Sequence, residues 1–293
     1  MAVRPVFTVS EADAIRFTVL TEFTWNGGFA VSQSRKNIAA LHESYHRFYP
    51  DHRLLEISSK SESELGRALS AFNLTLITPS GAENTVECFY QAGKVFEHGG
   101  PYIDLLNGTS RQAKRDERLK SSGAVIGFEL EGISFPARPI TLYYEWLYLN
   151  ALEQHPDLAD ALMEYDGFTD IAFNQARGNA CQAQACAVYA ALRRHGKLSD
   201  AMASPEVYAS IAFSKPETVI SHSVTGVSTP TPEEAPPKPK EPAIHTGCRL
   251  VHPVYGEGEV ANMAGGVATV NFSGTEKKLS CSWLEQHCNL MGA

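Results

Sequence analysis

The chain has 293 residues, of which 43% are hydrophobic and 20% charged, and its formal net charge is −8. This composition is ordinary for a soluble globular protein, and the negative balance means that any nucleic-acid contact must come from local basic patches. No apolar run of about 18 residues is present, so no membrane span is expected. Residues 1–17 lack the apolar core of a signal peptide, and the six cysteines form no dense framework. We therefore expect reduced thiols and a cytoplasmic location.

The pattern along the chain predicts an α+β fold in two parts. Short strands and longer helical stretches alternate over residues 1–212, which we predict to form one mainly helical domain with a few strands. Six prolines fall between Thr229 and Pro242, so residues 213–243 are expected to be an extended linker. Residues 244–293 follow as a small all-β module.

The first 50 residues are predicted to contain two strands, a turn and a helix. The strands are expected at Val6–Val9 and Ile15–Phe23, and an Asn-Gly-Gly turn follows them. A helix is expected from Ser32, which is a plausible N-cap residue. Polar side chains on its first turns are candidate ligand contacts, although such residues are more often simply solvated: Ser32, Gln33 and Lys36.

The central stretch Asn84–Phe96 is predicted to be one amphipathic helix. Glu87, Gln91 and Lys94 recur at i, i+4 and i+7, so they share one stripe beside an apolar face. A carboxylate, an amide and an amine in one row at the edge of a core are typical of an active site. Two other interpretations stay open: Asn84 and Glu87 match a capping box, and Glu87 with Lys94 could be a weak surface pair.

Three further polar groups flank this stretch in the sequence. Phe72 and Asn73 place an aromatic ring beside an amide, a combination that can stack on and hydrogen-bond a flat ring or a ribose. The basic run at 111–120 is the best candidate for phosphate contacts, through Arg111, Lys114 and Arg115. A later acid- and amide-rich loop is a candidate ligand loop and contains Glu164, Asp170 and Asn179.

The C-terminal module is predicted to consist of short strands between Gly-rich turns. Four strands are expected, a spacing that suits a five-stranded sheet or near-barrel, at Cys248–His252, Gly258–Met263, Ala268–Phe272 and Lys277–Cys281. Its cysteines and histidines have no zinc-site spacing. No metal and no cofactor are expected.

Several of these motifs, in this order, resemble the NADAR domain. The order is EIS, SAFN, TVECFYQAGKVF, EYDGFTDIAF and GNACQA. Glu87, Gln91 and Lys94 match the family's Glu-x-x-x-Gln-x-x-Lys helix residue for residue, and Phe72 with Asn73 match its Ser-Asn-Phe motif in inverted form. The later acids and final Asn of the family correspond to Glu164, Asp170 and Asn179. The usual Trp-Gly after the second acid is replaced by Phe173-Asn174.

The resemblance is closer still to one branch, the NADAR antitoxins encoded beside DarT-type toxins, and it covers roughly residues 3–212. The C-terminal segments RLVHPVYGEGEV, ATVNF and KKL resemble a Tudor-like or SH3-like tail of superfamily-one helicases. The tail is therefore expected to bind DNA or a DNA-processing protein.

The resemblance implies an N-glycosidase. DarT-type toxins attach ADP-ribose to guanine in single-stranded DNA, and the partnered NADAR protein removes it. Lys94 would then act at the anomeric carbon, as a Schiff-base nucleophile or a general acid, and Glu87 would act as acid/base. Implied partners are ADP-ribosylated DNA and the cognate toxin.

Three alternatives stay open at this point. The protein could be an N-glycosidase acting on free N-ribosyl nucleotides such as riboflavin intermediates. It could be a non-catalytic immunity protein that sequesters a toxin. It could also be a DNA-tethering adaptor in which the tail carries the function.

Overall fold

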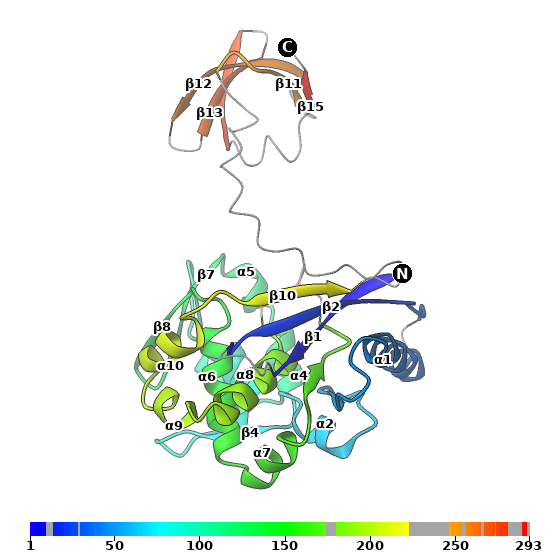
Figure 1. The fold of residues 1–293 in the computed structure, drawn as a ribbon. Coiled ribbons are helices and arrows are strands. Elements are labelled where there is room, and N and C mark those ends of the chain that lie inside the picture. Colours follow the sequence, from blue (N-terminus) through cyan, green and yellow to red (C-terminus); the bar gives the residue numbers. More distant parts are fainter. Residues whose placement is uncertain are drawn as a thin grey trace. The chain divides into compact units, whose positions relative to one another are not determined.

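The computed structural model describes residues 1–9, 14–28, 30–173, 180–222, 246–252, 256–264, 267–272, 274–280 and 289–291. The chain divides into two compact units, Met1–Ser228 and Thr229–Ala293 (Figure 1). The first unit mixes helices with several small sheets and the second is a small antiparallel sheet, which confirms the predicted α+β class. No helix within the described ranges is long and apolar enough to cross a membrane.

A five-stranded sheet forms one side of the first unit, in the order β10-β2-β1-β9-β3. Its strands are β1 (Ala2–Thr8), β2 (Phe17–Phe23), β3 (Leu54–Glu56), β9 (Gly167–Thr169) and β10 (Thr218–His222). Strand β10 pairs in parallel with β2 over its whole length. The predicted domain end at residue 212 is therefore wrong, because residues 218–222 complete the sheet at its edge. The rest of the predicted linker, residues 223–243, lies outside the described residues.

Helices surround this sheet and enclose the core. The core is centred on α6, whose tyrosines and leucines are buried on nearly every face of the helix. Helix α6 packs against both α3 and α8. Because apolar side chains occur on every face of α6, the helix must lie inside the unit and not on its surface. The helices are α1 (Val31–His46), α2 (Glu64–Ala68), α3 (Val86–Ala92), η1 (Ile103–Asn107), α4 (Ser110–Arg115), α5 (Arg118–Ser121), α6 (Leu142–Glu153), α7 (Pro156–Leu162), α8 (Gln182–Arg194), α9 (Leu198–Ala201) and α10 (Pro205–Ala212).

Two smaller sheets flank helix α3. Strands β4 (Thr75–Ile77) and β5 (Glu83–Thr85) form a hairpin immediately before it. Strands β6 (Lys94–Phe96), β7 (Val125–Leu130) and β8 (Ile133–Pro136) form an antiparallel sheet immediately after it. Helix α3 is thus held at both ends by strand pairing.

The central stretch is a strand, a short helix and a second strand, so the prediction of one helix from Asn84 to Phe96 is wrong. Helix α3 begins after Thr85, whose hydroxyl accepts a hydrogen bond from the Cys88 amide at 3.3 Å, whereas the Asn84 side chain donates to the Leu106 carbonyl at 2.7 Å. The capping box is therefore absent. The helix ends at Gly93, where a Cβ atom would lie 2.1 Å from the Tyr143 hydroxyl oxygen.

The second unit is a five-stranded antiparallel sheet in the order β14-β13-β12-β11-β15. Leu250, Val260 and Val270 are buried at its centre, and a bulge interrupts the pairing of β12 with β13 after Val260. The predicted β-strands are confirmed within the described residues, while barrel closure stays a prediction. The strands are β11 (Arg249–His252), β12 (Gly256–Ala264), β13 (Val267–Phe272), β14 (Thr275–Ser280) and β15 (Asn289–Met291).

Candidate active site

A cavity of about 300 Å³ opens beside α3 in the first unit. Its size is at the lower end of the range for small-ligand sites. It is bounded by α3, α4, the segment after β3, the segment after β9 and the start of α8. Its lining residues include carboxylates, amides, two lysines and three aromatic rings: Ser58, Ser59, Lys60, Ser70, Phe72, Glu87, Tyr90, Gln91, Lys114, Tyr144, Asp170, Ala172, Ala180 and Gln182.

Glu87 and Gln91 form the floor of the cavity from successive turns of α3. Each is only 5% exposed, and the Gln91 amide nitrogen donates to the Glu87 carboxylate at 2.8 Å. The Gln91 amide oxygen in turn accepts a hydrogen bond from the Lys94 ammonium at 2.7 Å. The three side chains therefore form one hydrogen-bonded row, although Lys94 belongs to β6 and not to the helix.

Lys94 lies at the end of this row and contacts two lining residues without lining the cavity itself. Its Nζ atom is 4.5 Å from the centre of the Tyr90 ring, in cation–π geometry, and bonds to Gln91. Burial lowers the pKa of Lys94 to about 8, the Glu87 carboxylate opposes this shift, and Lys114 adds to it. An amine with such a pKa is partly neutral near physiological pH, as nucleophilic lysines are.

Lys114 reaches into the cavity from α4. Its Nζ atom lies 3.3 Å from a Glu87 carboxylate oxygen and 4.8 Å from the centre of the Phe72 ring. Its side chain is 55% exposed, whereas that of Glu87 is buried, so the Lys114 ammonium can turn to solvent without itself being left buried and unpaired. Arg111 and Arg115, the other basic residues predicted to contact nucleic acid, are exposed on the same helix.

Asp170 and Gln182 form the wall that faces α3. Asp170 follows β9, and its carboxylate accepts hydrogen bonds from the Ala172 amide and from the Gln182 side chain, both at 3.0 Å. Gln182 also donates to the Ile57 carbonyl at 2.6 Å and accepts from the Ala71 amide at 2.9 Å. One side chain thus joins three loops. Burial raises the pKa of Asp170.

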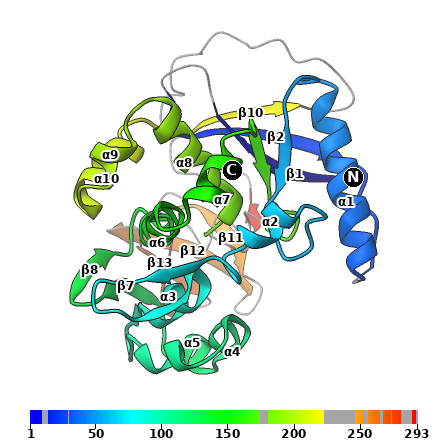
Figure 2. The ribbon, with the colours of Figure 1, turned by 90° about the horizontal axis from the view of Figure 1, so that it is seen from below.

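Several predicted contact residues lie elsewhere. Asn73 is exposed, and its amide donates to the Arg67 carbonyl at 2.7 Å. Glu164 forms an exposed pair with Arg53 at 3.1 Å. None of Asn73, Glu164 and the α1 residues lines the cavity, and the N-cap of α1 is Ala30 instead of Ser32. Figure 2 shows α1 at a different edge of the unit from α3 and α4. The α1 residues are Ser32, Gln33 and Lys36. Asn179 lies outside the described residues.

Nine of the lining residues were not predicted as site residues: Ser58, Ser59, Lys60, Ser70, Tyr90, Tyr144, Ala172, Ala180 and Gln182. Tyr90 and Tyr144 have the ordinary signature of core aromatics, and their rings meet edge-to-face at 5.0 Å. Gln182 offered the better signal, since it begins a helix inside a polar stretch. Only the fold shows that two of its partners, Ile57 and Ala71, lie more than 100 residues earlier.

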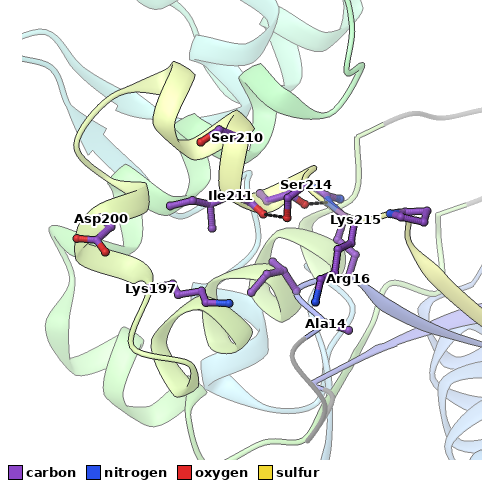
Figure 3. Close-up of a pocket in the computed structure, with 11 residues that line it drawn as sticks. Ala14, Arg16, Lys197, Asp200, Ser210, Ile211, Ser214 and Lys215 are labelled. Carbon is purple, nitrogen blue, oxygen red and sulfur yellow. Dashed lines mark hydrogen bonds between the residues drawn. The ribbon is translucent and has the colours of Figure 1, made fainter.

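A second cavity of about 310 Å³ lies between the start of β2 and helices α9 and α10 (Figure 3). Its buried cation Arg16 is 8% exposed, bonds through Nε to the Ala212 carbonyl at 3.0 Å and pairs with the buried Glu145. The Arg16 guanidinium is thus enclosed with its partners, whereas the Lys114 side chain beside Glu87 is 55% exposed. None of the predicted site residues lines it.

The fold and the first cavity together define an α+β protein with a polar small-ligand pocket built around an acid, an amide and an amine. Within the described residues, no three His, Cys, Asp or Glu side chains are placed to hold a metal ion. A family model described as DarT1-associated NADAR antitoxin matches residues 2–220. The chain therefore belongs to this antitoxin family. No curated protein matched the chain in a sequence comparison.

Proposed function

We propose that this antitoxin is an N-glycosidase that removes ADP-ribose from guanine in DNA and so reverses the modification made by a DarT-type toxin. The observation that carries the proposal is the hydrogen-bonded row of Glu87, Gln91 and Lys94 at a cavity of nucleoside size. Cleaving the bond between an anomeric carbon and a base nitrogen requires stabilisation of positive charge on the sugar and a proton for the leaving base. A carboxylate and an amine supply both.

In this mechanism Lys94 leaves its contacts with Tyr90 and Gln91 and enters the cavity, and the lone pair of its neutral amine adds to C1 of the ribose as the bond between C1 and guanine breaks. Guanine leaves with the bonding electrons, and the Glu87 carboxylate transfers to it a proton from the Lys94 nitrogen. Water then adds at C1, and Glu87 transfers a proton from this water to the Lys94 nitrogen, which leaves with the electrons of its bond to C1. Free ADP-ribose and unmodified guanine are the products, and Lys94 and Glu87 return to their starting states.

The remaining residues hold the substrate. Phe72 offers a ring face for stacking against a base, which requires Lys114 to give up its present position over that ring. Asp170 and Gln91 face the ribose, and Lys60 lies at the rim where phosphates would lie. The exposed Arg111 and Arg115 are suited to the DNA backbone, because contacts with phosphate need charge and access only. Asn73, Glu164 and the α1 residues Ser32, Gln33 and Lys36 are proposed only as contacts outside this cavity. Asn179 is proposed as a substrate contact from the family motif alone.

The test is release of ADP-ribose from a single-stranded oligonucleotide carrying ADP-ribosylated guanine. The wild type should release it, and Lys94→Ala should not, while Arg47→Ala serves as the control. Arg47 is an exposed cation outside the basic run at 111–120 and pairs with Glu43 on the surface of α1. Hydrolysis of small N-ribosides without activity on DNA would favour the alternative substrate class. If Lys94→Ala protects cells from the toxin as well as the wild type does, the protein binds the toxin without catalysis. If Lys94 is dispensable but deleting residues 230–293 abolishes protection, the protein is an adaptor.

A further inference from the structure

Glu56 is a buried carboxylate that the proposed chemistry leaves unused. It ends strand β3, is 3% exposed, and forms no salt bridge among the described residues. A buried carboxylate is costly unless hydrogen bonds satisfy it. Glu56 therefore must have partners that compensate for its burial.

Those partners lie on both sides of Asp170. The Thr169 hydroxyl donates to Glu56 Oε2 at 2.6 Å, and the Ile171 amide donates to Oε1 at 3.0 Å. The Ser58 hydroxyl, from a residue that lines the cavity, donates to Oε1 at 2.8 Å. One carboxylate thus holds the side chain of the residue immediately before Asp170 and the backbone amide of the residue immediately after it, from a strand more than 100 residues earlier.

The contact follows from sheet pairing. Strands β3 and β9 pair in parallel with Glu56 opposite Thr169, and the Ile57 amide donates to the Thr169 carbonyl at 2.8 Å. The ladder ends at this point, so Asp170 leaves the sheet with no further strand to hold it. Glu56 and Gln182 provide the next constraints on this segment.

We propose that Glu56 is the positioning residue for Asp170, and that it sets where this carboxylate meets the ribose of the substrate. This inference rests on the proposed N-glycosidase function. Glu56 touches no substrate in this account and acts only through the chain segment of residues 169–171.

The charged and titratable groups around this pair are His42, which contacts Thr169 at 2.9 Å, and Lys114, Tyr144 and Cys181 around Asp170. Burial and the neighbouring Asp170 raise the pKa of Glu56. Glutamine is therefore a close mimic of its neutral form. Its amide oxygen can accept from Ile171 and its nitrogen can donate to Thr169, whose hydroxyl can then donate to His42.

The experiment compares Glu56→Ala with the conservative Glu56→Gln, each alone and combined with Asp170→Ala. Hydrolysis of the ADP-ribosylated oligonucleotide should show a KM raised by up to about 100-fold in Glu56→Ala, because the carboxylate that binds ribose is displaced. Glu56→Gln should stay within about threefold of the wild type. In the Asp170→Ala background, Glu56→Ala should add nothing, since coupled residues are non-additive. Additive effects would overturn the inference.

Amide hydrogen exchange of residues 168–173 provides a readout that needs no substrate. Glu56→Ala should speed exchange at Ile171 and Ala172, and Glu56→Gln should not; unchanged exchange in Glu56→Ala would overturn the inference. If the wild type releases no ADP-ribose, the proposed function fails while this measurement still decides the role of Glu56. Should Glu56→Ala fail to fold, Thr169→Val removes one of the same hydrogen bonds and is expected to give a smaller change in the same direction.

Discussion

Two buried carboxylates of the first unit, Glu87 and Glu145, have opposite surroundings. Glu145 is 1% exposed and is held by the Arg16 guanidinium and by the Tyr208 hydroxyl at 2.6 Å, with Arg16 itself lying 4.0 Å over the Phe213 ring. Glu87 is nearly as buried, yet its partners are an amide and the half-exposed Lys114, and it faces a cavity. Burial alone therefore does not distinguish a structural acid from a reactive one. What distinguishes them is whether their partners can be displaced.

The largest expected loss of activity follows from replacing Lys94, the amine at the end of the row that contains Glu87. Lys94→Ala should lower kcat/KM for release of ADP-ribose by at least about 10⁴-fold, since the nucleophile is lost. The measurement is a time course with the ADP-ribosylated oligonucleotide. Folding should be kept, because a lysine with a lowered pKa costs stability when it is charged. Activity within tenfold of the wild type in Lys94→Ala would end the proposed role.

Glu87→Gln should lower kcat by about 10²–10⁴-fold, the usual contribution of a general acid/base. The Glu87 contact with Gln91 can be kept by the substituted amide, so the melting temperature should change little. Glu43→Gln is the matched control, because Glu43 is exposed and pairs with Arg47 on the surface of α1. If Glu87→Gln instead lowers the melting temperature strongly, and its loss of activity follows from unfolding, Glu87 has a structural role like that of Glu145.

Glu145→Ala tests the other side of the comparison. Removing one partner of a buried ion pair leaves the guanidinium of Arg16 uncompensated, and we expect a loss of about 3–5 kcal/mol in the free energy of unfolding. Denaturant unfolding measures it. The fraction that remains folded should cleave the substrate at close to the wild-type rate, because Glu145 does not line the cavity. Intact stability would show that Glu145 and Arg16 are not a structural pair.

The row of Glu87, Gln91 and Lys94 was predictable from sequence to the extent that it is local. Glu87 and Gln91 are four residues apart, and this spacing predicted that they share one stripe of a helix, where they are hydrogen-bonded. Lys94 keeps its place although the helix stops at Gly93, because the chain enters β6 beside the last turn. The opposite wall was predictable only in part. Asp170 was predicted from its polar loop and from the family resemblance, whereas Glu56 and Gln182 make contacts between segments more than 100 residues apart, which no local pattern encodes.

The misplaced predictions have a common physical origin. Asn73 and Glu164 were assigned to a ligand because their residue types suit one, but each is satisfied nearby, Asn73 by the Arg67 carbonyl and Glu164 by Arg53. Sequence does not show whether a polar side chain is already paired in the folded chain. Strand β10 was missed for a related reason, since its pairing with β2 joins the two ends of the unit.

A substitution at Gly93 tests whether the position of Lys94 depends on the close packing at the end of α3. A methyl group at this position would meet the Tyr143 hydroxyl at 2.1 Å and the Glu129 carbonyl at 2.6 Å. Gly93→Ala should therefore destabilise the first unit by about 1–3 kcal/mol, as overpacked sites do, and should lower kcat by shifting Lys94. The matched control is Gly27→Ala, at a position without positive φ and with no atom within 4 Å of the added Cβ. A Gly27→Ala variant that loses activity would show that the effect is not specific to the row.

The smallest expected effect is the pH dependence that separates the two roles of Lys94. The pKa of Lys94 lies at about 8, so a nucleophilic amine requires deprotonation, and kcat/KM should rise about tenfold per pH unit below 8 and level off above it. A general acid requires the protonated amine, and kcat/KM should then fall above pH 8. Arg16 beside Glu145 stays charged throughout this range, so that ion pair should not change the stability of the protein near pH 8. Measuring release of ADP-ribose from pH 6 to 10 decides between the two roles. A fall of kcat/KM above pH 8 would show that the protonated form of Lys94 is required, and would reject its role as nucleophile.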